Sequence, residues 1–544
     1  MKTGAGKFIK DNLKTQLFPV IMLIIGYFAV SVFSVLFALF SQYVVDSAVK
    51  GDFATFTYFA ICMAGFGILQ IVINMICRFC EEKIKARFDM KMRGNVFSAF
   101  LYKKYREQTK FHSGEIINRL SNDTAVISDG IIGILPHFFQ FVSKIIFTVI
   151  VLFGLDWRFA LTVVICGTAV FFGLRFLKIT IKRYHKRVQE ADGAVRSEWQ
   201  DSLASLPVIK AFSAEKEISE KSDGLLFSHF VARMKRRTVG ILSSTGLETV
   251  FRLGNLFAIV WGCLMLYSEP ETFTFGTLTA ILQLLSSIQA PFNQLSNMIP
   301  RYYQVTASAE RLCEVLSLED EGSDKLPPDV DFTSLKFENV TFSYGEETVL
   351  ENASFEVKKG ETVSVSGVSG GGKSTVLKLL LSLYTDYLGK ISLIAKDGNA
   401  LPLSDMKRGL FSYVPQDAQL FSGSIRDNIT FKRNCSEEEI KRALAVCCGD
   451  FVFELPNGLD TVLTERGGGL SEGQKQRLSV CRAVLFDAPI FILDEATSAL
   501  DVQTEKQMLE NLKALGKTVI MVNHRPAAQS YADRALTVKD KKVY

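Results

Sequence analysis

The sequence has few of the features expected of a small secreted domain. Its 10 cysteines are scattered along 544 residues, so no disulfide framework is expected. Cys77 and Cys80 form a C-x-x-C without a second Cys or His pair, which favours packing over a metal or redox site. The N-terminal MKTGAGKFIKDNLK lacks a cleavable signal pattern, because the apolar run after it is too long. It is also poor in Arg and Ser, which argues against a transit peptide.

The composition indicates a chain that is partly membrane and partly water-soluble. Hydrophobic residues make up 48% and aromatic residues 11% of the chain. The mean hydropathy of +0.20 is high for a soluble protein but low for one embedded throughout. The net charge of +5 is modest, and the length predicts two or more domains.

Long apolar runs occupy the first 300 residues. They fall at residues 18–40, 56–76, 134–155, 159–177, 239–267 and 275–299. Since about 20 apolar residues cross a bilayer, they predict six transmembrane helices. Only Asp156, Trp157 and Arg158 separate the third and fourth runs, which predicts a tight hairpin with Trp157 at the membrane interface.

The distribution of Lys and Arg predicts the orientation of these helices. Residues 78–110, 175–189 and 233–237 are rich in positive charge, whereas the connections 41–55, 156–158 and 268–274 are short and nearly free of it. Basic connections face the cytosol, so both chain ends are expected there. Two amphipathic stretches in the inner loops, 113–127 and 206–217, fit either loop caps or levers that touch a cytosolic domain. A nucleic-acid partner is not expected, because basic helix faces are usually solvated surface.

Polar groups inside the apolar runs are costly and suggest a functional path. Glu248 and Arg252 lie one turn apart and can pair with each other. Other residues that can line a watery path are Gln140, Lys144, Asn255, Asn293 and Gln294.

The second half begins after a polar, proline-bearing linker at 319–330 and alternates short β-rich runs with helices. Its central motif is GVSGGGKST at 367–375, between a short strand and an apolar-periodic helix, as a phosphate-binding P-loop requires. Lys373 can reach the β- and γ-phosphates, and Ser374 can hold Mg²⁺. The candidate ATP-binding residues of the loop are Gly367, Ser369, Gly370, Gly371, Gly372, Lys373, Ser374 and Thr375.

A second motif, PIFILDEATSALD, places two carboxylates at the end of an apolar strand. Asp494 suits Mg²⁺ coordination, directly or through water, and Glu495 can polarise an attacking water. Buried charge is costly unless it is used or paired, so a purely structural role for both acids is hard to explain.

These motifs resemble those of ABC transporters of the exporter class. LSEGQKQR at 470–477 resembles the family signature, which implies that Ser471, Gly473 and Gln474 meet ATP bound to an opposite subunit. Gln416 in YVPQDAQLF resembles the glutamine that senses Mg²⁺ and water, so it joins Ser374 and Asp494 as a candidate metal-site residue.

Further family motifs follow in the expected order. Asp501 in SALD resembles the D-loop residue, His524 in VNHR the switch histidine, and Tyr344 in FSYG the aromatic that stacks on adenine. The resemblance implies Glu495, His524 and Gln416 as catalytic residues. Glu465 and Arg466 resemble the loop that contacts the membrane domain.

The resemblance covers essentially the whole chain and also identifies GEIINRLSND and IKAFSAE as its two coupling-helix regions, which favours the lever interpretation. The sequence departs from the family at Glu472, where glycine is commoner, although Gly473 is kept. The usual acidic, glycine-containing tail is missing after KDKKVY, and no cysteine-protease domain precedes the membrane part, which counts against a peptide processor.

The implied fold is an α-helical membrane domain with six transmembrane helices, then an α/β P-loop ATPase domain. The expected boundaries are 1–318, 319–330 for the linker and 331–544. The implied cofactors are ATP and Mg²⁺, and the working unit is a dimer of half-transporters. A homodimer is favoured because every catalytic position is present, while a heterodimer is also allowed. The expected location is a bacterial plasma membrane.

The expected function is ATP-driven export of a small amphiphile, such as a drug, lipid or peptide-like metabolite, by alternating access. One alternative is an exporter-shaped importer of a metal-chelate compound, which uptake in cells would distinguish. Another is a non-transporting ATPase that regulates a partner protein and shows no substrate-stimulated turnover.

Overall fold

The computed structural model describes residues 2–322, 331–368, 370–406, 409–431, 433–523, 525 and 529–544. The backbone alone is described at 2–3, 169–182, 292–293, 295–297, 299 and 466. The chain forms two compact units. The helical unit holds Met1–Leu101 and Ser113–Ser317, and the sheet unit holds Tyr102–His112 and Leu318–Tyr544. The short Tyr102–His112 segment therefore belongs with the second half of the chain.

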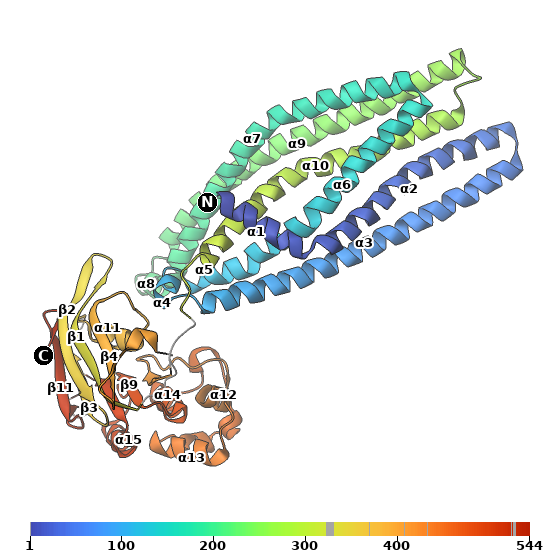
Figure 1. The fold of residues 1–544 in the computed structure, drawn as a ribbon. Helices are drawn as coiled ribbons and strands as arrows, with labels where there is room; N and C mark the ends of the chain where they lie inside the picture. The colour runs from blue at the N-terminus through green and yellow to red at the C-terminus, as the bar shows by residue number, and fades with distance from the viewer. Residues whose placement is uncertain are drawn as a thin grey trace. The chain divides into compact units, whose positions relative to one another are not determined.

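The helical unit consists of long helices that run side by side (Figure 1). Its elements are α1 (Lys2–Thr15), α2 (Leu17–Lys50), α3 (Phe53–Leu101), α5 (Ser113–Asn118), the π-helical turn η1 (Arg119–Asp123), α6 (Thr124–Leu155), α7 (Trp157–Ala204), α8 (Leu206–Ala211), α9 (Glu215–Ser268) and α10 (Phe275–Leu316). Apolar side chains from α2, α6, α7, α9 and α10 form one core cluster, including Val35, Leu152, Phe159, Ala258 and Leu284.

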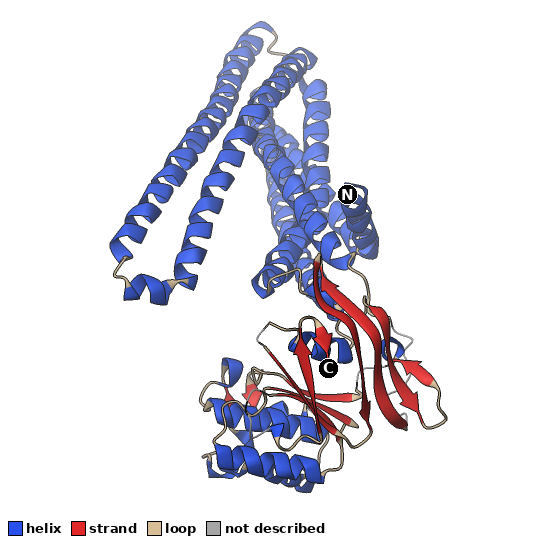
Figure 2. Ribbon diagram, turned by 90° about the vertical axis from the view of Figure 1, so that its left-hand side faces the viewer, coloured by secondary structure: helices blue, strands red, loops and turns tan. Residues whose placement is uncertain are grey.

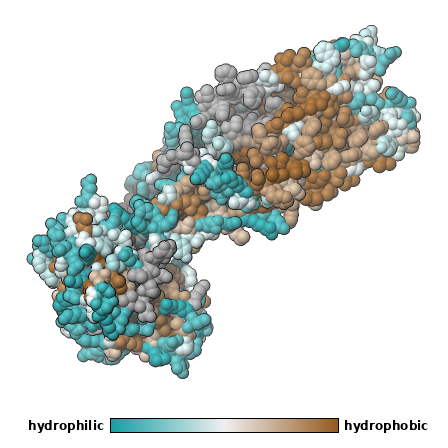
Figure 3. All heavy atoms as spheres, viewed as in Figure 1, coloured by the Kyte–Doolittle hydropathy of each residue, from teal (hydrophilic) through white to brown (hydrophobic). Residues whose placement is uncertain are grey.

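Each apolar run predicted to span a membrane lies within one of these long helices. Among the described residues, Leu17–Lys50, Phe53–Leu101, Ser113–Leu155 and Glu215–Ser268 are long and apolar enough to cross a bilayer. In α7, Trp157–Thr168 is a shorter apolar stretch. Hydrophobic residues form a broad band over this unit, with polar residues towards its ends (Figure 3). The number of six spans stays a prediction.

The predicted hairpin between α6 and α7 is confirmed. Asp156 alone separates the two helices, and its carboxylate accepts hydrogen bonds from the backbone N–H groups of Arg158 (2.9 Å) and Phe159 (3.1 Å). Those bonds satisfy orphan donors at the start of α7. The Asp156 side chain also accepts from Trp261 Nε1 at 2.9 Å, while Trp157 is exposed. The hairpin is therefore tied to α9.

The predicted polar residues of the apolar runs fall in different places. Arg252 Nη2 lies 2.8 Å from Glu248 Oε1, so that pair forms, but both side chains are exposed. Asn255 donates to the Phe251 carbonyl of its own helix at 3.1 Å, and Gln294 is exposed. The Asn293 side chain lies outside the described residues.

A buried charged cluster that the sequence analysis missed lies where α2, α3 and α6 meet. Glu81 is 6% exposed, and its carboxylate accepts a hydrogen bond from the Tyr27 hydroxyl. Lys85 Nζ lies 2.8 Å and His137 Nε2 3.2 Å from the same carboxylate. A buried carboxylate is tolerated only with such partners, so this cluster ties the three helices together.

The inner loop before α6 is held by buried polar contacts to α10. The stretch 113–127 folds into the helical unit, where the buried Asp123 accepts hydrogen bonds from Ser308 (2.8 Å) and Arg311 (2.8 Å) of α10. Arg119 also donates to the Arg311 carbonyl at 2.6 Å. These bonds hold η1 against α10. The preceding segment, Tyr102–His112, belongs to the sheet unit, and the interpretation of 113–127 as a lever stays a prediction.

The sheet unit contains sheets and short helices (Figure 2). Its strands are β1 (Phe332–Tyr344), β2 (Glu347–Lys358), β3 (Thr362–Gly367), β4 (Leu388–Ala395), β5 (Ala400–Pro402), β6 (Phe411–Val414), β7 (Gly423–Ser424), β8 (Val462–Leu463), β9 (Ile490–Asp494), β10 (Thr518–Val522), β11 (Arg534–Lys539) and β12 (Lys542–Val543). Its helices are α4 (Tyr105–Gln108), α11 (Lys373–Leu380), α12 (Ile425–Thr430), α13 (Glu437–Val446), α14 (Glu472–Phe486) and α15 (Val502–Ala514). Short 3-10 turns lie at Leu403–Asp405, Asp450–Glu454, Gly458–Asp460 and Glu465–Gly467.

Two main sheets carry this unit. In the described residues, an antiparallel sheet has the order β2-β1-β4-β5, a mainly parallel sheet has the order β12-β11-β3-β10-β9-β6, and β7 pairs with β8. The central strands β9 and β10 are buried at every residue, as expected for apolar parallel strands covered on both faces. One apolar core joins the two main sheets and α11, and a second surrounds α13, α14 and α15.

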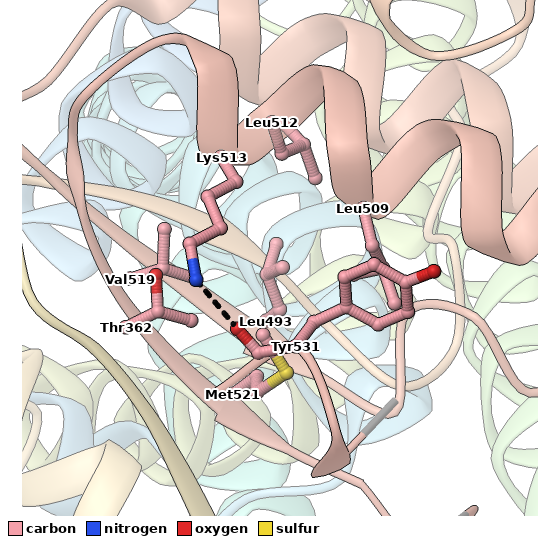
Figure 4. Close-up of a pocket in the computed structure, with 8 residues that line it drawn as sticks. All are labelled: Thr362, Leu493, Leu509, Leu512, Lys513, Val519, Met521 and Tyr531. Atoms are coloured by element: carbon pink, nitrogen blue, oxygen red, sulfur yellow. Dashed lines mark hydrogen bonds between the residues drawn. The ribbon is translucent and has the colours of Figure 1, made fainter. Parts of the chain in front are cut away.

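A small cavity lies between α15 and the parallel sheet (Figure 4). It measures about 10 Å³ and is lined mainly by apolar side chains, among them Leu509 and Leu512. Lys513 crosses its edge and donates to the Tyr531 carbonyl at 3.3 Å. A space of this size holds about one water molecule, so it is a packing gap and not a ligand site.

Candidate functional site

The candidate site lies at one edge of the parallel sheet. The strands β3, β10, β9 and β6 are parallel neighbours, so their carboxyl ends meet at the same edge. Ligands of such sheets bind outside that edge. Gly367 ends β3, Asp494 ends β9, Asn523 follows β10, and Gln416 follows β6 by two residues. The sheet thus brings together motifs that are far apart in the sequence.

The loop after β3 has the conformation that a phosphate cradle needs. Gly370 and Gly372 have φ values of +77° and +102°, which glycine adopts without strain. A Cβ on Gly370 would meet nothing within 4 Å, so the loop is open at this point. The helix α11 begins directly afterwards at Lys373 and directs its N-terminus at the same place. Such a loop and helix end bind anions, which fits the triphosphate of ATP.

Lys373 supplies the positive charge of this loop. It is 7% exposed, and its Nζ donates to the carbonyl oxygens of Gly367 (2.9 Å) and Val368 (3.0 Å). The ammonium is therefore held inside the loop, where it can meet a phosphate. The predicted Ser369 lies outside the described residues, and Ser374 is exposed in the first turn of α11.

The two acids at the end of β9 have different environments. Asp494 is 7% exposed, and burial, together with the charge of Glu495, raises its pKa, while Lys378 and Lys373 oppose the shift. Glu495 has φ +49°, unusual for a residue other than glycine, and its N–H donates to the Val522 carbonyl at 3.0 Å. Such backbone strain gathers at functional sites.

Gln416 and Glu495 are brought together as the sequence predicts. Gln416 Nε2 donates to Glu495 Oε2 at 3.0 Å, although 79 residues separate them. An amide and a carboxylate in contact can hold a water between the sheet edge and a phosphate.

The residues present fit Mg²⁺ bound together with a phosphate. The described residues contain no group of three or more His, Cys, Asp or Glu that could hold a metal alone. Mg²⁺ usually takes one or two protein ligands and completes its shell with waters and substrate phosphates. Asp494, Ser374 and Gln416 supply such a partial set of oxygen donors.

The buried charge of Asp494 leads to a stability prediction. Because the folded chain raises the pKa of this carboxyl, ionised Asp494 destabilises the fold above that pKa, and the cost is lost as pH falls below the unfolded value. We therefore expect Asp494→Asn to raise the melting temperature at pH 7 without nucleotide, by a few degrees (about 2–4 °C per kcal/mol). The same variant is expected to lose Mg²⁺-dependent ATP hydrolysis. A lower melting temperature at pH 7 would contradict the argument.

The start of α14 explains the pattern LSEGQ. Ser471 and Gln474 form a reciprocal cap, in which Ser471 Oγ accepts from Gln474 N (3.3 Å) and Gln474 Oε1 accepts from Ser471 N (2.9 Å). A Cβ on Gly473 would lie 2.9 Å from the Ala499 carbonyl, so only glycine fits without movement. Glu472 is exposed and lies 3.3 Å from Lys475, so the departure from the family pattern is accommodated on the surface.

The chain after Glu495 is held by residues that the sequence analysis missed. The buried Gln476 donates to Ser498 Oγ (2.8 Å) and accepts from Ala499 N (3.0 Å). Arg525 donates to the carbonyls of Ser498 (2.7 Å) and Leu500 (2.8 Å). Gln476 stands inside LSEGQKQR and Arg525 inside VNHR, so their place in those motifs was the available signal.

The remaining predicted residues lie on the same unit. Asp501 caps α15 by accepting from Thr504 N at 3.0 Å, and that bond lowers its pKa. Tyr344 ends β1, its hydroxyl accepts from Thr375 Oγ1 at 3.5 Å, and Lys378 Nζ lies 6.0 Å from its ring centroid. Glu465 begins a 3-10 turn, while His524 and the side chain of Arg466 lie outside the described residues.

Comparisons with known proteins agree with this arrangement. The family model described as ABC transporter transmembrane region matches residues 20–292, and the model described as ABC transporter matches residues 350–498. An ATP-dependent lipid A-core flippase of Desulfotalea psychrophila is 31% identical over 494 residues, 88% of this chain and 83% of that protein. One of Haemophilus influenzae is 28% identical over 503 residues, 91% and 85% of the two chains.

A solved structure shares the fold. It is described as a bacterial Atm1-family ABC exporter with ATP bound, and its TM-score is 0.79 at 23% identity, covering 98% of this chain and 94% of that one. The predicted fold class, a helical membrane domain followed by an ATPase domain, is confirmed, as is ATP binding. The chain belongs to the ABC transporter family, with a transmembrane region and an ATPase domain in one polypeptide, and it is an ATPase coupled to transport across a membrane.

Proposed function

We propose that this protein moves an amphiphilic lipid across a bacterial inner membrane, from the cytosolic side outward. The observation that carries the proposal is the similarity, across both halves of the chain, to proteins named ATP-dependent lipid A-core flippase. An apolar bundle that holds a buried carboxylate, Glu81, next to the half-buried Lys85 suits a substrate with a long apolar part and a polar head. The alternatives of metal-chelate uptake and pure regulation have no comparable support.

The working unit we propose is a homodimer. One chain carries one P-loop and one LSEGQ segment, and the family resemblance pairs each P-loop with Ser471 and Gly473 of an opposite subunit. All the positions required for hydrolysis are present in this chain, so two copies make two complete sites.

The proposed domains are residues 1–318 and 331–544, with 319–330 as the linker between them. Because the inner loops are basic, both ends of the chain are proposed to lie in the cytosol.

In the proposed hydrolysis, each residue has a distinct task. The loop N–H groups and Lys373 bind the phosphates, and Tyr344 stacks on the adenine. Mg²⁺, when bound, neutralises charge on the phosphate oxygens, and Asp494, Ser374 and Gln416 would hold it. Glu495 accepts a hydrogen bond from Gln416 and orients the water that attacks the γ-phosphate. His524 and the opposite Ser471 complete the contacts to that phosphate.

Reconstitution of the purified chain tests this function. In proteoliposomes of phosphatidylethanolamine and phosphatidylglycerol, we expect lipid A to stimulate ATP hydrolysis. We also expect ATP to drive the transfer of a fluorescent lipid between the two leaflets, measured by dithionite quenching. Glu495→Gln is the matched control and should do neither. Stimulation by a hydrophobic cationic dye and not by lipid A, without ATP-driven lipid transfer, would contradict a lipid substrate.

A further inference from the structure

The segment Tyr102–His112 is docked on the sheet unit by backbone and side-chain bonds. Lys104 N donates to the Glu319 carbonyl at 2.9 Å, and Glu321 N donates to the Tyr102 carbonyl at 2.8 Å. Lys103 Nζ lies 2.7 Å from the Asp320 carboxylate. The segment follows α3 and precedes α5 in the chain.

Three tyrosine rings connect this segment to the adenine side of the candidate site. The Tyr344 and Tyr384 rings lie 5.4 Å apart at 88°, and the Tyr384 and Tyr105 rings lie 5.8 Å apart at 89°. Both contacts are edge-to-face, an arrangement that aromatic pairs prefer. Tyr344 ends β1, Tyr384 follows α11, and Tyr105 begins α4. The three rings therefore cross from one end of the nucleotide site to the docked segment.

Tyr384 is the central ring and is firmly held. It is 7% exposed and belongs to the apolar core of the sheet unit. Tyr344 is 38% exposed, so one part of its ring is free for a base to cover. Because the Tyr344 ring also contacts Thr375 and Lys378, its position is linked to the P-loop helix.

We propose that Tyr384 is a positioning residue that links base stacking on Tyr344 to the position of Tyr105 and its segment. A base that covers Tyr344 fixes the orientation of that ring, and edge-to-face contact passes the constraint through the buried Tyr384 ring to Tyr105. The inference rests on the proposed ATP site and goes beyond it. It states that the base of the nucleotide, as well as its phosphates, affects the position of the docked segment.

Limited trypsin digestion of the full chain in nanodiscs tests this link, because the segment carries Lys103, Lys104, Arg106 and Lys110. The probes are AMP-PNP with Mg²⁺, and tripolyphosphate with Mg²⁺, which has no base. In the wild type we expect AMP-PNP to change the cleavage rate in the segment about 3-fold or more beyond the change caused by tripolyphosphate. In Tyr384→Leu we expect this difference to vanish while AMP-PNP still raises the melting temperature.

Two control variants separate the link from simple stability. Tyr384→Phe keeps the ring and loses only the hydroxyl group, so it should retain the base-dependent protection. Phe355→Leu removes one ring of the stacked Phe337–Phe355 pair (4.3 Å) in the same core and should also retain it. If Tyr384→Leu does not fold, Tyr105→Leu, at the partly exposed end of the series, takes its place.

The outcomes distinguish the two proposals. If the wild type shows no melting shift with AMP-PNP, the proposed ATP site itself fails. If wild type and Tyr384→Leu bind AMP-PNP and show the same base-dependent protection, the ATP site stands and the link through Tyr384 is wrong.

Discussion

Replacing Glu495 by glutamine is expected to leave ATP bound and to remove most hydrolysis. The loss should be on the order of 10²-fold or more, comparable to the removal of other groups that act only in the transition state. The variant keeps the size of the side chain and an oxygen that can accept from Gln416, so the local geometry should persist. What it removes is the charge that polarises the attacking water.

A local structural change at residue 495 is not expected to cause the loss of hydrolysis, because the backbone there is held independently of the side chain. Its backbone is fixed in an unusual conformation, and its N–H donates to the Val522 carbonyl. Neither feature depends on the side-chain charge. Turnover of ATP in nanodiscs and the AMP-PNP melting shift together separate catalysis from binding.

Glu472→Gln is the matched control for this experiment. Glu472 is also an acid at the start of an element of the candidate site, but it is exposed and pairs with Lys475, a type of pair worth about 0–1 kcal/mol. We expect nearly normal turnover in this variant. Normal hydrolysis in Glu495→Gln would instead show that another group activates the water.

Local sequence patterns predicted the parts of this protein that depend on neighbouring residues. Apolar runs of sufficient length predicted helices that contain them, and glycines before a helix predicted the open loop around Gly370. The strand before Asp494 was also predicted from a local pattern, because a short apolar run that ends in two acids is typical of a buried strand that leads to a binding site.

Contacts between distant residues could not be predicted in this way. Glu81 meets Tyr27 and His137 from two other helices, and Tyr105 meets Tyr384 across 279 positions. Periodicity shows which face of a helix is apolar but not which helix will cover it. The bonds of Asp123 to Ser308 and Arg311 of α10 are of the same kind, since they join residues about 185 positions apart.

Lys373→Ala is the other variant with a large expected effect. It should weaken the binding of ATP as well as its hydrolysis. The ammonium lies inside the loop, held by two backbone carbonyls, with its charge directed at the place where phosphates would lie. A buried charge-assisted contact is lost, so ATP affinity should fall about 10²-fold or more, which corresponds to about 2.8 kcal/mol. Hydrolysis falls with it at ordinary ATP concentrations.

The control for Lys373→Ala is a lysine of the same unit far from the loop motif. Lys513 contacts the Tyr531 carbonyl and Asp533 at the end of α15, so Lys513→Ala should bind AMP-PNP normally. Both variants are measured by the AMP-PNP concentration that gives half of the maximal melting shift, with the melting temperature before nucleotide addition as the test of folding. Since the loop N–H groups and the α11 N-terminus remain in Lys373→Ala, the AMP-PNP affinity left in this variant measures the contribution of those backbone groups. Affinity within twofold of the wild type would mean that these backbone groups alone hold the phosphates.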